Sequence, residues 1–404
     1  MARLNPMFGD KSRSDISEED LEAYLYYLNV KSAYEEKKAE VEQALPNISY
    51  LVELIPSSRE KLLAYFKVDA LTEDLVNSVP GTNGALAQAK MVMGILYQNK
   101  ISEEDLKDYK GRLEDDLAYR LNLEFQPRTV VGDDYSNLSE TGYGNADVAG
   151  PDPSHGTHVS GIIGAIRDNG LGIDGIAGDV RIMVLRTVPD GDERDKDVAN
   201  AIRYAVDNGA DIINMSFGKS FASDYQVVEA AIRYADENDV LMVHGSGNDG
   251  ADIDSAPNFP KADFSDGTES RNWLEVGASS WEKGDKIAAT FSNYGAGSVD
   301  LFAPGVAIYS TYPDNTYKPE DGTSMAAPVV SGVAALVMSF FPNLSAGQVK
   351  QILLDSADRS FADRFVTRPG TEGSLVKFSR LSRTGGLVNA EAAFVMASGL
   401  SGSR

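Results

Sequence analysis

The stretch DGTSMAAP, residues 321–328, runs directly into an apolar segment at 329–341. Gly322 and the small residues after Ser324 place this serine in the first turn of a predicted helix. The first N–H groups of a helix have no partner inside it, and the helix dipole is positive at that end. The serine could therefore cap the helix. Alternatively, its hydroxyl could be a nucleophile whose product oxyanion those N–H groups stabilise, and residues elsewhere in the chain decide between the two.

The composition limits the classes of partner. With 404 residues, of which 42% are hydrophobic, the chain can form one large α/β domain and an additional region. A formal net charge of -24 repels phosphate backbones and anionic lipid, so we expect no nucleic acid partner and no membrane insertion. We see no run of membrane-spanning length and no signal peptide at the N-terminus. The absence of Cys and the presence of only three His residues argue against a Cys or His metal centre.

Residues 1–126 read as helical. The tetrapeptide Ser-Glu-Glu-Asp occurs at 17–20 and again at 102–105, and an apolar stripe with helical spacing follows each copy. We expect the first helix to end near residue 44, and Pro46, Pro56 and the turn at 80–84 to separate shorter helices. No catalytic constellation is visible here, so this region is predicted to be an accessory region or an insertion.

After Pro127 the pattern changes, because short apolar runs alternate with segments of helical periodicity. The apolar runs predict strands at 129–131, 180–188, 211–217, 240–243, 274–278 and 299–302. Helical spacing predicts helices over 198–206 and 227–234. This alternation favours a mostly parallel sheet with right-handed crossovers and helices on both faces. We therefore expect an α/β fold whose functional residues lie at the carboxyl ends of the strands.

A histidine opens one predicted helix, in DPSHGTHVSG at residues 152–161. A lone histidine is more often structural than catalytic. However, Gly156 and Thr157 leave the imidazole of His155 accessible, which suits a base that must meet a hydroxyl. His158, one turn later, is predicted to be a packed or hydrogen-bonded side chain.

Two strand ends carry further candidates. The strand ending in NMSFG, residues 214–218, could offer the backbone groups of Ser216, Phe217 and Gly218 to an extended peptide. The next strand ends in GSGND, residues 245–249, which contains Asn248. Asn248 is either a left-handed turn residue or a donor that stabilises an oxyanion together with the Ser324 N–H.

Taken together and in this order, the motifs resemble those of the subtilisin-like serine proteases, the subtilases. The motifs are HGTH at 155–158, NMSFG at 214–218, GN at 247–248, APG at 303–305, GTSMAAP at 322–328 and GGLVNA at 385–390. The resemblance covers about residues 127–397. It implies a three-layer α/β sandwich with a mostly parallel sheet over residues 127–404, preceded by the helical region 1–126. A lipase-type hydrolase fits less well, because its serine turn needs Gly where this chain has Ala326.

The resemblance also implies a function and roles for single residues. It implies a serine endopeptidase that acts on proteins or peptides through an acyl-enzyme, with Ser324 as the nucleophile and His155 as the general base. Asn248 would be the oxyanion donor, and Ser216, Phe217 and Gly218 would be part of the substrate cleft. No cofactor is required for this chemistry. The family is usually secreted or found in the cell envelope, commonly accepts large apolar side chains and often binds structural Ca²⁺, for which the loop at 167–175 is the candidate without named ligands.

The chain departs from the family pattern at the third catalytic residue. Subtilases carry an Asp upstream of the histidine in an Asp-Ser-Gly or Asp-Thr-Gly setting, and no such tripeptide precedes His155. One interpretation uses Asp133, in VVGDDY at 130–135, as a substitute, with Asp134 as a weaker choice. Another places residues 1–126 in a helical insertion, as in some large bacterial subtilases, so that the Asp strand would precede Met1. That second interpretation predicts a weak or inactive peptidase.

Two alternatives from other functional classes remain open. The first is a non-catalytic, subtilase-like protein that binds peptides in the retained cleft. The second is a docking or inhibitory role for residues 1–126.

Overall fold

The computed structural model describes residues 4–80, 84–189, 193–282 and 284–401, and contacts divide the chain into two units. The first unit lies within residues 4–127 and is helical. Its elements are α1 (Asn5–Phe8), η1 (Arg13–Asp15), α2 (Leu21–Phe66), α3 (Glu73–Asn77), α4 (Ala85–Asn99), α5 (Glu103–Asp115) and the π-helical turn η2 (Asp116–Arg120). Of the turn expected at 80–84, residues 81–83 lie outside the described residues.

Helix α2 is much longer than the sequence predicted, because it continues through both Pro46 and Pro56. A proline inside a helix removes one backbone hydrogen bond and costs about 3 kcal/mol. Buried side chains such as Ile55 and Leu62 pack in a cluster with residues of α4, and burying each side chain of this size contributes about 1.5–3 kcal/mol. Tertiary packing therefore overrides the local break, and the expected divisions at Pro46 and Pro56 were wrong. The division expected near 80–84 is confirmed, because α3 ends at Asn77 and α4 begins at Ala85.

The predicted start of α5 is confirmed in detail. Ser102 accepts the Asp105 N–H through its hydroxyl at 3.0 Å, and the Asp105 carboxylate accepts the Ser102 N–H at 2.9 Å. This reciprocal capping box satisfies two backbone donors that the helix itself cannot satisfy. The matching signal at 17–20 forms a similar local bond from the Asp20 N–H to the Ser17 hydroxyl, and α2 begins at the next residue.

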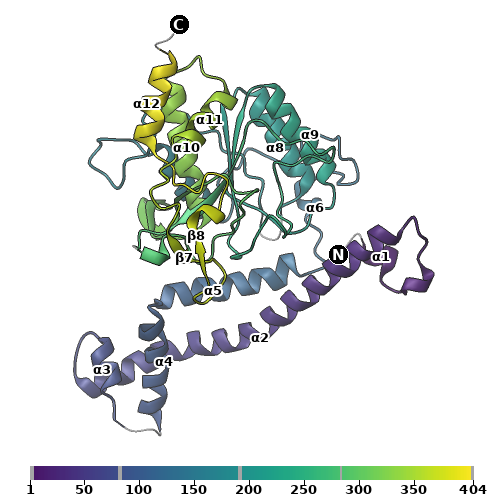
Figure 1. Ribbon diagram of the computed structural model, residues 1–404. Coiled ribbons are helices and arrows are strands. Elements are labelled where there is room, and N and C mark those ends of the chain that lie inside the picture. Colours follow the sequence, from purple (N-terminus) through teal and green to yellow (C-terminus); the bar gives the residue numbers. More distant parts are fainter. Residues whose placement is uncertain (1–3, 81–83, 190–192, 283, 402–404) are drawn as a thin grey trace. The chain divides into compact units, whose positions relative to one another are not determined.

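The second unit, from residue 128 onward, is built on a four-stranded parallel sheet (Figure 1). Its strands are β1 (Ile212–Met215), β2 (Leu241–Gly245), β3 (Trp273–Ser279) and β4 (Leu301–Pro304), and they lie side by side in that order. In this register His244 of β2 pairs with both Met215 of β1 and Glu275 of β3.

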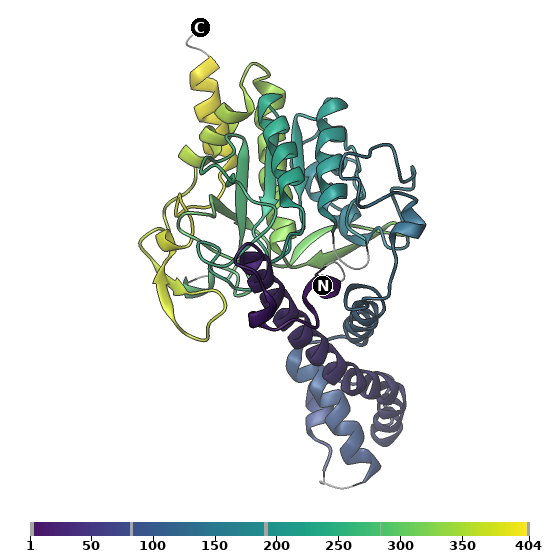
Figure 2. The same ribbon diagram turned by 90° about the vertical axis from the view of Figure 1, so that its right-hand side faces the viewer.

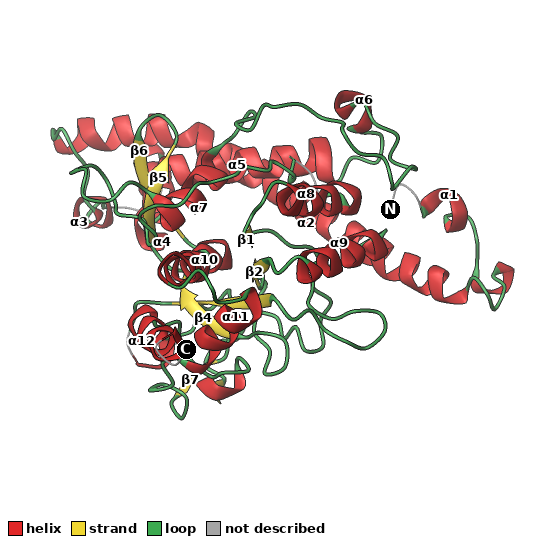
Figure 3. Ribbon diagram, turned by 90° about the horizontal axis from the view of Figure 1, so that it is seen from above, coloured by secondary structure: helices red, strands yellow, loops and turns green. Residues whose placement is uncertain are grey.

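Helices cover both faces of this sheet, which gives three layers (Figures 1 and 3). One face packs against α10 (Thr323–Phe340), α11 (Ala346–Asp355) and α12 (Ala390–Ser401). The other packs against α8 (Asp195–Asp207) and α9 (Tyr225–Glu237), the two teal helices in front of the sheet in Figure 2. Successive residues of β2 alternate between the two cores, as the two-residue period of a strand requires. The predicted three-layer α/β fold is confirmed.

Helix α10 runs through the centre of one layer. It is 18 residues long with a mean hydropathy of 1.6, so by length and composition it could cross a membrane, which the sequence analysis did not expect. However, 61% of this window is buried inside the protein. A helix covered on several sides by its own protein is apolar all round, so the composition of α10 is that of a core helix.

Two expected strands are absent from the described residues. Residues 129–131 belong to the short helix α6 (Arg128–Val131), where Val130 is 85% exposed. Residues 180–188 form no strand, and their apolar side chains at 182–184 and 188 are exposed by 41–45%. An apolar run forms a strand only where a neighbouring backbone can accept its hydrogen bonds, and the described residues offer this segment no such ladder.

Helix α7 (Ser154–Gly164) packs on the antiparallel hairpin of β5 (Ile308–Tyr312) and β6 (Thr316–Glu320). The approach is close, because a Cβ at Gly161 would lie 2.1 Å from the Thr311 hydroxyl oxygen. His158 is buried, and its Nε2 lies 3.0 Å from the Lys318 carbonyl, so it is the hydrogen-bonded histidine that the sequence predicted. The hairpin leads directly into α10. The remaining elements are η3 (Gly284–Lys286), β7 (Phe365–Thr367), β8 (Leu375–Lys377) and η4 (Phe378–Arg380).

Candidate active site

Ser324 is the second residue of α10, directly after the Gly322-Thr323 turn. Its side chain is half-buried and its hydroxyl donates to the Ser216 carbonyl at 3.2 Å. In return, the Ser216 hydroxyl donates to the Ser324 carbonyl at 2.8 Å. These two bonds tie the first turn of α10 to the residue that follows β1.

Asn248 follows β2 and is oriented by the residue next to Ser324. Its Oδ1 accepts the Thr323 N–H at 2.9 Å and the Thr323 hydroxyl at 3.0 Å. The same Thr323 hydroxyl oxygen accepts the Gly247 N–H at 3.1 Å. With Oδ1 held by two donors, the Asn248 amide turns its NH₂ group toward the start of α10.

The two expected oxyanion donors converge on one place. A Cβ at Gly322 would lie 3.5 Å from Asn248 Nδ2 and 3.5 Å from the Ser324 backbone nitrogen. Gly322 has φ +154°, a conformation that essentially only glycine adopts. Glycine here therefore serves two needs: it permits the turn, and it keeps the space in front of both donors free of a side chain. Two N–H donors that border the same space can stabilise a negative charge that develops there.

His155 lies in the first turn of α7, and its side chain is exposed. Helix α7 packs on α10 through a cluster that contains Val159, Ile162 and Met325. Val159 lies one turn after His155, and Met325 directly follows Ser324, so the packing brings the first turns of both helices to the same end of the core. Among the described residues, no hydrogen bond joins His155 to Ser324. Such bonds are often long before substrate binds.

The surroundings of His155 favour its neutral form. Desolvation by the surrounding protein lowers the pKa of this imidazole, although its edge reaches the surface, and the like charge of His158 lowers it further. Asp152 has a smaller opposing effect. In the described part of the chain, no carboxylate forms a hydrogen bond or ion pair with His155. A neutral imidazole can accept a proton, but nothing described fixes its tautomer.

Asp133, the substitute carboxylate considered above, is held elsewhere. It accepts bonds from Arg128 Nε and Lys196 Nζ, each at 2.6 Å, and its side chain is fully buried. Burial alone would raise the pKa of Asp133, but the bonds to these two cations lower it below its ordinary value. Asp134 bonds instead to Ser136 through its carboxylate. Asp133 therefore belongs to a structural ion-pair cluster, which argues against a role beside His155.

The segment Ser216, Phe217 and Gly218 leaves the end of β1 and is anchored at several points. Besides the bonds of Ser216 to Ser324, the Phe217 carbonyl lies 2.7 Å from His244 Nε2. Lys219 exchanges two main-chain hydrogen bonds of 2.9 Å with Phe259. These anchors fix the backbone of the predicted substrate segment.

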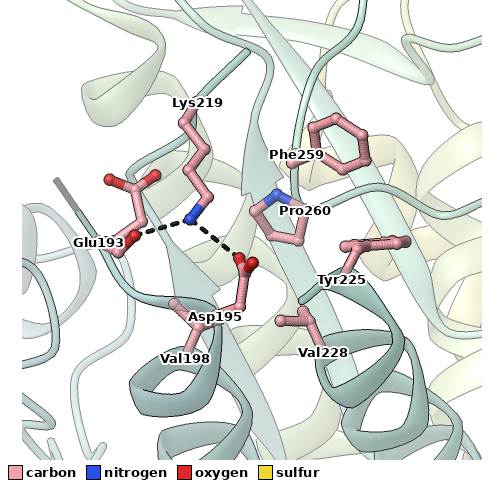
Figure 4. A pocket seen from close by; sticks show the side chains of 8 residues that line it. All are labelled: Glu193, Asp195, Val198, Lys219, Tyr225, Val228, Phe259 and Pro260. Carbon is pink, nitrogen blue, oxygen red and sulfur yellow. Dashed lines mark hydrogen bonds and ion pairs between the residues drawn. The ribbon is translucent and has the colours of Figure 1, made fainter. Parts of the chain in front are cut away.

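The side chain of Lys219 adds a further anchor (Figure 4). Its Nζ lies 2.9 Å from the Asp195 carboxylate and 2.7 Å from the Glu193 carbonyl. The hollow drawn in Figure 4 surrounds this anchor and is not lined by Ser324 or His155. A separate pocket of about 300 Å³ borders Asn258, Phe259 and Glu275, again without Ser324 in its lining.

Sequence reasoning missed three residues that organise this region: Thr323, His244 and Glu275. Thr323 stood inside the quoted motif, but its bond to Asn248 depends on two chain segments meeting. Glu275 was recognisable as a polar residue inside one predicted strand, and His244 as the residue directly after another. What could not be predicted is that the sheet register places them opposite each other.

The loop at 167–175, the candidate calcium loop, uses its oxygens locally. Asp174 Oδ1 accepts the Asp168 N–H at 3.0 Å, and Asn169 Oδ1 accepts the Leu171 N–H at 2.8 Å. No group of three or more His, Asp or Glu side chains placed to hold a metal ion occurs within the described ranges.

Comparison with known proteins agrees with this geometry. The sequence profile of the subtilase family matches residues 77–378, which is more than half of the chain. The chain belongs to the subtilase family. It is 36% identical over 205 residues to subtilisin DY of Bacillus licheniformis, a match that covers 50% of this chain and 70% of the relative. It is 38% identical over 207 residues to the thermophilic serine proteinase of Bacillus sp. strain AK1, covering 51% of this chain but only 47% of that protein.

A solved structure supports the same fold for this subtilase. A chain from the structure titled "Structural basis of subtilase cytotoxin SubAB assembly" superposes with a TM-score of 0.50 and 27% sequence identity, covering 61% of this chain and 77% of that chain. Membership of the subtilase family implies that the substrates are proteins or peptides.

Proposed function

We propose that this subtilase is a serine endopeptidase in which Ser324 is the nucleophile, His155 the general base and Asn248 an oxyanion donor. The observation that carries the proposal is that Asn248 Nδ2 and the Ser324 backbone nitrogen border one space in front of Gly322. A capping serine needs no such pair of donors. A hydroxyl that attacks a carbonyl does, because the carbonyl oxygen becomes negatively charged.

The proposed reaction has two halves. Ser324 Oγ attacks the peptide carbonyl carbon while neutral His155 takes its proton, and the carbonyl oxygen moves into the space in front of Gly322. The C–N bond then breaks, His155 returns the proton to the leaving amine, and an ester to Ser324 remains. In the second half, His155 takes a proton from water as the water attacks the ester carbonyl, the C–O bond to Ser324 breaks, and His155 returns the proton to Ser324 Oγ as the carboxyl product leaves. No cofactor takes part in either half.

The substrate chain would lie along Ser216, Phe217 and Gly218. The Phe217 carbonyl bonds inward to His244, and if the segment is extended, the backbone groups of Ser216 and Gly218 would point to the opposite side. The Ser216 carbonyl, which accepts the Ser324 hydroxyl in the free protein, would be released as that hydroxyl turns to His155. An added strand would align the scissile bond with Ser324.

A second candidate function is peptide binding without cleavage. It is favoured by one observation, namely that no described carboxylate orients His155. In a serine protease triad, loss of the correct histidine tautomer lowers turnover by about 10⁴. A cleft with intact peptide-binding groups and an unoriented base would then bind more than it cuts.

A fluorophosphonate probe separates the two functions. The enzyme function predicts covalent labelling of Ser324, located by peptide mapping, together with cleavage of an unfolded protein substrate. Ser324→Ala should abolish both, and heat-denatured protein should not label. Binding of an extended peptide without labelling of Ser324 would instead support the second function.

A further inference from the structure

A buried ion pair lies beneath the predicted substrate segment. His244 Nδ1 lies 2.9 and 3.0 Å from the two carboxylate oxygens of Glu275, and the exposed fractions of the two side chains are 0% and 5%. Glu275 also accepts hydrogen bonds from Trp273 Nε1 at 2.8 Å and Asn258 Nδ2 at 3.2 Å. Both oxygens of the carboxylate therefore have hydrogen-bond partners, although a pocket borders this side chain.

The hydrogen bonds of His244 define its protonation. Nδ1 faces a carboxylate and Nε2 faces the Phe217 carbonyl at 2.7 Å, and both of these partners accept. Both ring nitrogens therefore donate, which makes the ring an imidazolium. Burial opposes this charge, but the charge of Glu275 and the hydrogen bonds of Glu275 and Phe217 raise the pKa of His244 above its ordinary value.

The ion pair is connected to Ser324 through the backbone of Phe217 and Ser216. His244 holds Phe217, and Ser216 next to it exchanges two hydrogen bonds with Ser324. On the other side, a Cβ at Gly218 would lie only 3.6 Å from His244 Nε2. The ring thus bonds to Phe217 and borders Gly218, and Ser216, the third residue along which the substrate chain would lie, directly precedes Phe217.

We propose that His244 and Glu275 are positioning residues for substrate: the ion pair fixes the direction of the Phe217 carbonyl and so the backbone of Ser216 and Gly218. This inference rests on the proposed function of the same site. Neither residue touches Ser324 or the reacting bond. Two apolar side chains of similar size could fill the space, but they would leave the Phe217 carbonyl without a donor. What the ion pair alone provides is therefore a hydrogen bond that fixes the direction of this carbonyl.

Two double variants test the proposal. His244→Leu with Glu275→Leu keeps the site apolar and removes the donor to Phe217, whereas His244→Gln with Glu275→Gln keeps an amide donor without charge. Leu353→Ala, in the α11 core away from this segment, is the control for general destabilisation. Each protein is assayed for peptide cleavage and for the rate of labelling by a small fluorophosphonate that does not extend along the segment.

The double leucine variant should raise KM for an extended peptide at least about tenfold, as expected from loss of one hydrogen bond to a charged group, and should change the labelling rate less than about threefold. The double glutamine variant should recover most of the KM. Leu353→Ala should leave both values unchanged per folded molecule. An unchanged KM in the double leucine variant, or equal losses of cleavage and labelling, would overturn the proposal.

Hydrogen exchange of the backbone over residues 214–221 gives a readout that does not need activity. The double leucine variant should exchange this segment faster than the wild type and faster than Leu353→Ala. If the wild type neither cleaves nor labels, the proposed function fails, yet this exchange still decides the positioning role. Unchanged exchange in the double leucine variant would refute it.

Discussion

His155 and His244 belong to the same unit and have opposite environments. His155 is exposed, has no described hydrogen-bond partner and has a lowered pKa. His244 is buried, bonds through both ring nitrogens and has a raised pKa. Burial alone would make the second ring the less basic of the two. The presence of a carboxylate partner therefore determines the direction of the pKa shift. Contact with Glu275 outweighs desolvation and raises the pKa of His244, whereas His155 has no such contact and desolvation lowers its pKa.

The difference assigns the two rings to different tasks. A base that accepts a proton from a hydroxyl near neutral pH must be neutral and accessible, as His155 is. A buried ring with both nitrogens engaged, as in His244, is not free to take a proton from a hydroxyl but can hold backbone in place. The following predictions test this division, from the largest expected effect to the smallest.

Removing the accessible imidazole should have the largest effect on chemistry. His155→Ala is expected to lower the rate of Ser324 labelling by about 10²–10⁴, the usual range for a general base. Binding of an extended peptide should persist, because the Ser216–Gly218 segment is intact. Stopped-flow or quenched labelling measures the rate. Labelling at the wild-type rate would show that His155 is not the base.

Removing the oxyanion donor should affect kcat rather than KM. Asn248→Ala is expected to lower kcat by about 10²–10³, a magnitude taken from the corresponding asparagine of subtilisin, which is itself a subtilase. The matched control is Asn258→Ala, whose amide contacts Glu275 and the Ser246 carbonyl rather than the Ser324 turn. A fall in kcat of similar size in both variants would contradict the assignment.

Breaking the buried pair should affect stability. Glu275→Ala leaves the His244 charge unpaired and should cost about 3–5 kcal/mol. The folded pKa of His244 is raised, so its contribution to stability is fully present below the unfolded value of about 6.5 and is lost as pH rises through the folded value. The melting temperature should therefore fall above about pH 6.5 in the wild type. In the double glutamine variant this part of the decline should disappear, and an identical decline in both proteins would contradict the account.

The smallest effect is expected at Asp152, the carboxylate that opposes the lowered pKa of His155. Its Oδ1 accepts the Ser154 N–H at 2.9 Å, a bond that the amide oxygen of Asp152→Asn can keep. The variant should lower the His155 pKa slightly further, because Asp152 is the smallest of the influences on this ring and an exposed pair interacts weakly. NMR titration of the His155 ring measures the shift, and a rise in pKa would be inconsistent with the stated cause.

The sequence predicted those parts of the fold that local pattern determines. Four apolar runs became β1 to β4, Ser102 and Asp105 formed their capping box, and GTSMAAP opened α10. The sequence-based prediction was wrong where contacts between residues far apart in the chain determine the secondary structure. Helix α2 passes through Pro46 and Pro56 because α4 and α5 pack on it, and residues 180–188 lack the neighbouring strand that their composition suggests.

In the candidate site, too, local sequence indicated some residues, whereas other contacts depend on the tertiary structure. Ser324, Asn248 and His155 could be singled out because each sits beside glycines and small residues at a strand end or helix start. The pairing of His244 with Glu275 could not, because it depends on the register between β2 and β3. The commitment of Asp133 to Arg128 and Lys196 was equally invisible, since Lys196 lies 63 positions away in the chain.

The most direct measurement is the rate at which a fluorophosphonate labels Ser324 as a function of pH. With a neutral, accessible His155 as the base, the rate should rise with a midpoint below the ordinary histidine value of about 6.5, reach a plateau near neutral pH and disappear in Ser324→Ala. A rate that rises continuously with hydroxide concentration and is unchanged in His155→Ala would contradict the account.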